Sequence, residues 1–164
     1  MSPLKLADYS VPSVLETSEF RLRMLSVHDV VKDYEAVITS REHLQGVFGP
    51  KNQWPTADLS LEQNLIDLGW HQKEFQNKTS FAYTVVSLDE TRCLGCVYID
   101  PAKPSHYDAQ VIFWVRQSEL ARGLEEQLLA AVKLWMSDAW PFEQVGFPGR
   151  EIAWLEWESL SCQH

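Results

Sequence analysis

Apolar and polar residues alternate along several short stretches of the chain, which is the pattern of half-buried β-strands. In the first stretch, from Glu19 to Leu25, Phe20, Leu22 and Met24 alternate with two arginines. Further strands are predicted, in chain order, at 81–88, 93–100, 107–115 and, as a short final strand, 141–147.

Other stretches repeat apolar residues every three or four positions, which is the period of an amphipathic helix. This period predicts helices over 27–38, 60–77 and 119–138, with a short terminal helix over 152–160. Ser26 and Ser60 stand at expected N-cap positions. Leu61, Leu65 and Leu68 form the expected buried stripe of the second helix.

Prolines and glycines mark the segments between these elements. Residues 1–18 are interpreted as an extended N-terminal arm, and 43–57 as a loop. The length of the chain favours one domain, over 19–164. The order strand, helix, helix, three strands, helix, strand and short helix predicts an α/β (α+β layered) fold with helices packed on one mixed sheet.

Charge and cysteine usage narrow the function classes. A net charge of −9 argues against an undirected nucleic-acid binder. Cys93 and Cys96 form a lone C-x-x-C pair inside a predicted strand, where alternation places them on opposite faces. Buried structural thiols are the favoured interpretation, with redox and metal roles left open. Because neither a signal peptide nor a stretch of about 20 apolar residues is expected, a cytoplasmic protein without a membrane span is predicted.

The transition from the strand at 111–115 to the helix after Leu120 has the design of an anion site. Leu120-Ala121-Arg122-Gly123-Leu124-Glu125 places a glycine before the first helical turn. The free N–H groups and the dipole of such a turn favour a phosphate. The acidic pair Glu125-Glu126 opposes this use.

The run from Ala109 to Arg116, through the turn at 120–124 and into Leu128-Leu129, resembles the fourth strand, the pyrophosphate turn and the third helix of the GNAT acyltransferases. The similarity is to the branch that acetylates protein N-termini and small amines, and the strand at 20–23 resembles the first strand of that family. It covers roughly residues 19–147. It implies a mixed central sheet with helices on both faces, acetyl-coenzyme A as cosubstrate, an amine acceptor and no metal.

The resemblance assigns candidate site residues. Acyl-coenzyme A binding falls on the strand end and the turn: Trp114, Val115, Arg116, Arg122, Gly123, Leu124 and Glu125. The family polarises the thioester carbonyl with a backbone N–H near Val115. Asp100, Asp108 and His106 are the candidate bases, with solvated strand ends and an exposed loop histidine as the alternative interpretation. Acceptor recognition is expected from the loop at 43–57 and the helix at 60–77, where Trp54, Trp70 and His71 stand out.

Three functional hypotheses follow. The first is an N-acyltransferase that passes an acetyl group to an amine within a ternary complex. The second is a catalytically impaired binding or regulatory module, because Leu120 and Glu125 depart from the family turn and Gln110 stands where the family often has an acid. The third is an interaction protein, with Trp154 and Trp157 forming the surface of a possible homodimer.

Overall fold

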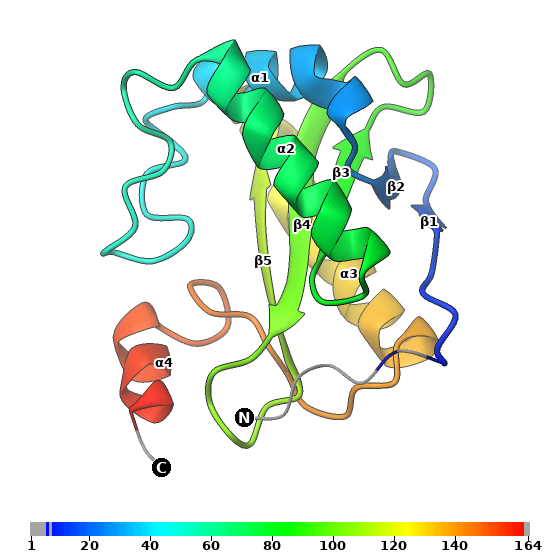
Figure 1. Ribbon diagram of the computed structural model, residues 1–164, viewed down its shortest axis with the longest axis vertical. Helices are drawn as coiled ribbons and strands as arrows, with labels where there is room; N and C mark the ends of the chain where they lie inside the picture. The colour runs from blue at the N-terminus through cyan, green and yellow to red at the C-terminus, as the bar shows by residue number, and fades with distance from the viewer. Residues whose placement is uncertain (1–5, 7, 163–164) are drawn as a thin grey trace.

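The chain builds one six-stranded sheet, described in a computed structural model over residue 6 and residues 8–162 (Figure 1). Residues 1–5 and 7 of the predicted arm lie outside the described part. The strands follow the chain order across the sheet: β1 (Val14–Glu16), β2 (Arg21–Met24), β3 (Phe81–Val86), β4 (Cys93–Pro101), β5 (Ala109–Val115) and β6 (Val145–Gly146). Neighbouring strands are antiparallel except β5 and β6, which are parallel, so the predicted mixed sheet is confirmed.

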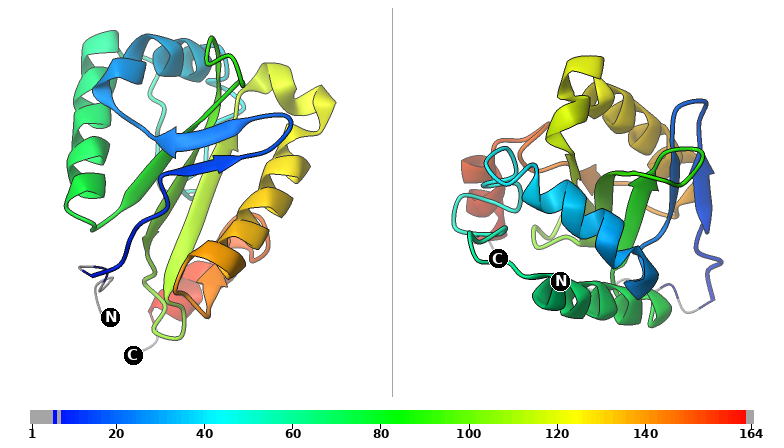
Figure 2. Two further views of the ribbon diagram at one scale, coloured as in Figure 1. Left: turned by 90° about the vertical axis from the view of Figure 1, so that its right-hand side faces the viewer. Right: turned by 90° about the horizontal axis from the view of Figure 1, so that it is seen from above.

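Helices cover both faces of this sheet (Figure 2). The helical elements are η1 (Val27–Asp29), α1 (Val30–Ile38), α2 (Leu61–Gln76), η2 (Gln117–Arg122), α3 (Leu124–Ala139) and α4 (Trp154–Ser161). Helices α1 and α2 pack on one face, and α3 packs on the other. The predicted α/β layered architecture is therefore confirmed.

Within the described part of the chain, no helix is long and apolar enough to cross a bilayer.

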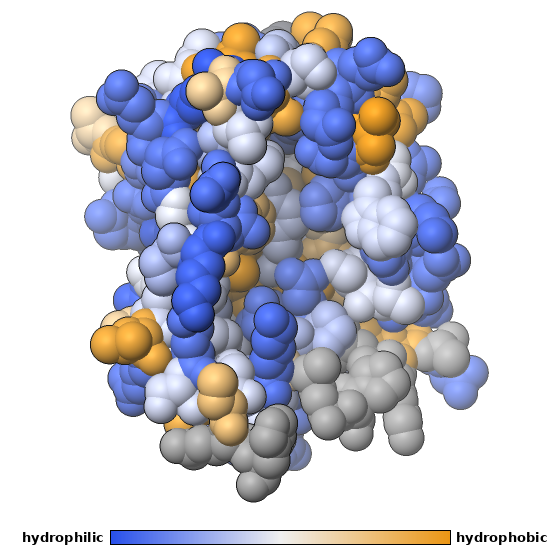
Figure 3. Space-filling view, turned by 60° about the vertical axis from the view of Figure 1, so that its left-hand side comes forward, coloured by the Kyte–Doolittle hydropathy of each residue, from blue (hydrophilic) through white to orange (hydrophobic). Residues whose placement is uncertain are grey.

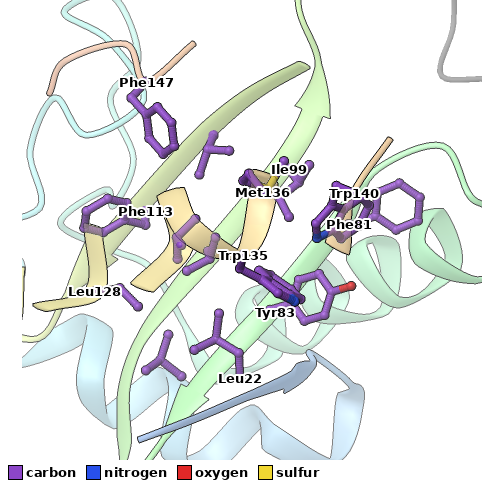
Figure 4. Packing of buried hydrophobic residues seen from close by; sticks show 14 of the residues in the cluster. Leu22, Phe81, Tyr83, Ile99, Phe113, Leu128, Trp135, Met136, Trp140 and Phe147 are labelled. Atoms are coloured by element: carbon purple, nitrogen blue, oxygen red, sulfur yellow. The ribbon is translucent and has the colours of Figure 1, made fainter. Parts of the chain in front are cut away.

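The core under α3 is rich in aromatic side chains (Figure 4). The Tyr83 ring meets Trp135 at 4.9 Å between centroids, and Trp135 meets Trp140 at 5.6 Å, both edge to face. The Tyr83 hydroxyl donates to the Pro12 carbonyl at 2.6 Å. The core thereby fixes the N-terminal arm, whose segment β1 pairs with β2 and covers that edge of the sheet.

A register shift in β4 changes which side chains face α1 and α2. Val85 pairs with Gly95 but Val86 pairs with Cys93, so that Leu94 is skipped. As a result Cys93 and Cys96 both enter the core under α1 and α2, and the expectation that they lie on opposite faces is wrong. Both are buried free thiols, as the structural interpretation required. Burial raises the pKa of Cys93 far above its ordinary value.

The inner face of α2 differs from the predicted leucine stripe. Leu61 and Leu65 are 45% and 41% exposed, whereas Leu68 is buried together with the polar Asn64. Asn64 takes an inward position because its amide has a buried partner on α1, Asp33. An apolar stripe alone therefore misplaced the face of this helix.

We expect Ser60→Ala to lower the free energy of unfolding by about 1 kcal/mol. The Ser60 hydroxyl accepts the Gln63 N–H at 3.0 Å and caps α2, as predicted. Urea denaturation of the wild type and the variant measures the loss. Ser60→Asp, which keeps a capping acceptor, serves as the control and should retain wild-type stability; an equal loss in both variants would contradict the capping role.

Candidate functional site

Strands β5 and β6 separate soon after they meet. They pair only at Ala109 with Val145 and at Gln110 with Gly146. After β6 the chain turns away through Gly149, which has the left-handed φ of 82° that suits glycine. A cavity of about 260 Å³ opens beyond the last pair, and Ile112, Phe113 and Trp114 of β5 line it. We call this gap the β5–β6 split.

The N-terminus of α3 borders the β5–β6 split. The predicted continuous helix from 119 is instead two elements, because η2 ends at Arg122 and Gly123 takes a left-handed φ of 75°. Leu124 is buried and anchors the first turn of α3. Gly123 is the N-cap and no side chain caps this helix. The geometry is that of a helix start with its backbone donors available to an anion.

Arg150 lies across the β5–β6 split. Its Nη1 donates to Glu125 Oε2 at 3.0 Å, and its Nη2 donates to the Phe113 carbonyl at 2.9 Å. The guanidinium carbon lies 3.7 Å from the centre of the Phe113 ring. Arg150 was not predicted from the sequence. Glu125 was the residue that could have indicated it, because an acid in the first helical turn beside a predicted phosphate site needs a cation to neutralise its charge.

Arg116 and Arg122, the two arginines predicted to bind the cofactor, make ion pairs within the protein. Arg116 donates to Glu35 at 2.6 and 2.9 Å and to the Cys93 carbonyl at 3.0 Å, and so ties β5 to α1. This contact lowers the pKa of Glu35. Arg122 pairs with Glu119 at 2.9 Å, but its side chain is 66% exposed. Arg122 is thus the one of the two positioned to turn toward a ligand at α3.

A second cavity, of about 310 Å³, lies between the loop at 43–57, α2 and β4. We call it the α2 cavity; Figure 3 shows the hollowed face on which the loop and α2 meet. Its lining joins the two predicted acceptor segments: Leu25, Asp33, Phe48, Asn52, Trp54, Asn64, Asp67, Leu68, Trp70, His71 and Tyr98. The structure thus brings Trp54, Trp70 and His71 together.

Asp33 is the buried acid of the α2 cavity. Its side chain comes from α1, the residue is 4% exposed, and Oδ2 accepts the Asn64 amide at 2.9 Å. Burial raises the pKa of Asp33 to about 6, and the like charges of Asp29 and Asp67 act in the same direction. Sequence reasoning missed this residue; Asn64 at a buried spacing of α2 was its only local sign.

Aromatic contacts connect the two cavities. The Trp114 indole N–H donates to the Tyr98 hydroxyl at 3.0 Å, and the Trp114 ring lies 6.1 Å from that of Trp54. Trp114 lines the β5–β6 split, while Tyr98 and Trp54 line the α2 cavity. His71 lies 5.3 Å from the Tyr98 ring, and burial lowers its pKa. Near neutral pH its imidazole is therefore unprotonated and able to accept a proton.

The three predicted bases lie outside the linings of both cavities. Asp108 accepts the N–H groups of residues 143 and 144 at 2.8 and 2.9 Å and so holds the start of β6. Asp100 accepts the Ser80 hydroxyl, and burial raises its pKa. The His106 ring lies 4.7 Å from the Tyr107 ring, between centroids, and is tilted against it. Each of the three makes its described contact with another residue, and their catalytic roles stay predictions.

The two tryptophans of α4 pack against other residues of the same chain. Trp157 is 3% exposed and lies 4.8 Å from the Tyr107 ring. Trp154 lines the β5–β6 split and packs over Gly149. Trp157 is therefore unavailable to the expected dimer surface, whereas the homodimer itself stays a prediction. Among the described residues, no group of three or more His, Cys, Asp or Glu side chains is placed to hold a metal ion.

Comparisons with known proteins identify the fold. No protein-family model and no curated protein sequence matches the chain. A ribosomal-protein-S5-alanine acetyltransferase from Vibrio fischeri superposes with a TM-score of 0.66 at 16% identity, over 82% of this chain and 72% of that one. The ribosomal L7/L12 alpha-N-protein acetyltransferase RimL, solved with coenzyme A, gives 0.62 at 17% identity, over 76% and 68%.

A third solved structure covers more of the chain. A protein from Bordetella pertussis, assigned to the GNAT-family acetyltransferases, gives a TM-score of 0.58 at 15% identity, over 92% of this chain and 86% of that one. The chain therefore has the fold of the GNAT acetyltransferases.

Proposed function

We propose that this protein is an N-acyltransferase that transfers an acetyl group from acetyl-coenzyme A to an amine by direct attack within a ternary complex. The observation that carries the proposal is the β5–β6 split, where an open strand edge meets the N-terminus of α3. Solved proteins of the same fold are acetyltransferases, and one of them was crystallised with coenzyme A.

The β5 edge offers the groups that a thioester needs. The Phe113 carbonyl faces the β5–β6 split, since Arg150 reaches it there. The N–H and C=O groups of every second residue in a strand point toward the same edge, so the N–H of Val115 lies on the same edge as the Phe113 carbonyl. A donor at this position polarises the thioester carbonyl and stabilises the developing oxyanion. The diphosphate then lies against the first turn of α3, at Gly123, Leu124 and the Glu125 backbone.

The α2 cavity is the acceptor side in this proposal. The amine nitrogen attacks the thioester carbonyl carbon, a tetrahedral intermediate forms, and the coenzyme A thiolate leaves as the amide is completed. The proton lost by the amine goes to a base. His71 is favoured over Asp100, Asp108 and His106, because only His71 lines this cavity and its pKa is lowered.

Titration with acetyl-coenzyme A by calorimetry tests the proposal. We expect saturable binding in the micromolar range, followed by release of free thiol when an amine panel is added. If acetyl-coenzyme A does not bind even at millimolar concentration, the proposal that this protein is an acyltransferase is wrong.

A binding module without catalysis is the second candidate function. The Arg150 side chain favours it, because its guanidinium occupies the Phe113 carbonyl at the β5 edge, where the thioester is proposed to lie. The same experiment separates the two. Coenzyme A binding without thiol release across the amine panel supports the module, whereas turnover rejects it.

A further inference from the structure

Within the part of the chain that the structure describes, the charge of Asp33 has no cationic partner. Its Oδ2 accepts a hydrogen bond from the neutral Asn64 amide. Among the described residues, no lysine or arginine forms an ion pair with it, whereas the neighbouring Asp29 is held by Arg23 at 2.8 Å. A buried carboxylate in an apolar setting is costly unless a cation compensates it. The α2 cavity, which Asp33 lines, is where such a cation fits.

The walls of the α2 cavity suit an organic cation rather than a metal ion. Phe48 packs edge to face with Trp54 at 5.3 Å and with Tyr98 at 5.0 Å. Aromatic faces attract ammonium groups and also bury hydrocarbon. At the rim, Trp70 is 57% exposed and already has the Lys73 ammonium 4.8 Å from its ring centre.

The charged residues that line the α2 cavity also favour a cationic ligand. Two carboxylates, Asp33 and Asp67, line the cavity, and none of the described lysines and arginines does. Its one basic side chain, His71, is held neutral by burial. An anion would meet two like charges there and is excluded on that ground.

We infer that the α2 cavity binds a small organic ammonium ion, with its charged nitrogen at Asp33 and its hydrocarbon part against Phe48, Trp54 and Tyr98. The volume of about 310 Å³ admits an alkyl or arylalkyl amine. That this ion is also the acetyl acceptor rests on the proposed function; the binding itself does not, because it requires neither coenzyme A nor catalysis.

Three probes of similar shape test the inference on the full chain without coenzyme A. Calorimetric titrations use phenylethylammonium chloride, the neutral 2-phenylethanol and the anion 3-phenylpropionate. We expect the ammonium ion to bind at least about tenfold more tightly than the alcohol, and the carboxylate not to bind. Equal binding of the ammonium ion and the alcohol, or no binding of the ammonium ion, would overturn the inference.

Two variants locate the charge. Asp33→Asn should weaken phenylethylammonium binding by about tenfold or more. The control Asp138→Asn, an exposed acid of α3 on the opposite face of the sheet, should leave it unchanged. Unchanged affinity in Asp33→Asn, with its fold verified by circular dichroism, would overturn the site. If the amine binds but acetyl transfer is absent, the cation site stands and the acyltransferase proposal falls.

Discussion

Asp33→Asn is expected to raise the free energy of unfolding at neutral pH by about 2–3 kcal/mol. The wild-type carboxyl must ionise inside the α2 cavity, where burial raises its pKa to about 6. The unfolded chain ionises the same group at its ordinary pKa. Asparagine keeps the size of the side chain and an oxygen that accepts the Asn64 amide, but it carries no charge to desolvate.

The pH dependence of this gain has a definite sign. Between the ordinary pKa of an aspartate and about 6, the folded protein binds a proton that the unfolded chain does not. Wild-type stability therefore falls as the pH rises through this window. The advantage of Asp33→Asn should be absent near pH 4, grow toward pH 6 and stay constant above it. The nearby acids Asp29 and Asp67 and the imidazole of His71 also face this group and are unchanged in the variant.

Urea denaturation of both proteins from pH 4 to pH 8 measures the effect. Asp67→Asn is the matched control, since it removes an acid from the same cavity at a less buried position. It should change stability by less than about 0.5 kcal/mol at every pH. A loss of stability in Asp33→Asn that does not depend on pH would contradict an uncompensated buried charge. A protein that keeps such a charge gives up stability for the binding of a ligand.

The sequence predicted the order of the main strands and helices because their patterns are local. The alternation around Leu22 and the cap at Ser60 need only neighbouring residues to act, and both are confirmed. The skipped residue at Leu94 could not be predicted, because it depends on the pairing of β3 with β4. Leu61 and Leu65 were misplaced for a similar reason: the inward turn of α2 depends on a residue of α1.

In the candidate site, too, the features set by neighbouring residues were predicted, and those that depend on tertiary contacts were not. The turn before α3 was predicted from its glycine, and Gly123 does take the left-handed conformation. The partner of Glu125 could not be predicted, because Arg150 follows it by 25 residues through a segment without regular spacing. Asp33 escaped notice because a lone acid within a helix looks like a solvated position. Burial and the approach of Asn64, both tertiary properties, give it chemical meaning.

Glu125→Gln is expected to tighten coenzyme A binding by about tenfold. The substitution removes a negative charge from the first turn of α3, where the diphosphate is proposed to lie. It also frees Arg150, whose guanidinium then pairs with phosphate oxygens instead of Glu125. Because the pair is partly exposed, breaking it costs only about 0.5–1 kcal/mol. The gain in phosphate contact exceeds this cost.

Glu126→Gln is the matched control, because it removes the same charge one residue further along the same helix. Its side chain is exposed, and no ion pair with it is found in the described part of the chain. We expect it to tighten binding less than about threefold, through the long-range charge alone. Calorimetric titration of both variants with coenzyme A gives the comparison, and the difference between them should shrink as salt is added.

The two variants also separate two accounts of the acid in this turn. If Glu125 serves only to hold Arg150 in the β5–β6 split, its removal lets the ligand reach the Phe113 carbonyl, and Glu125→Gln alone gains affinity. An equal gain in both variants would mean that charge repulsion is the whole effect and that Arg150 does not obstruct the split. No gain in either would place the diphosphate away from α3, and the proposed orientation of coenzyme A would have to be abandoned.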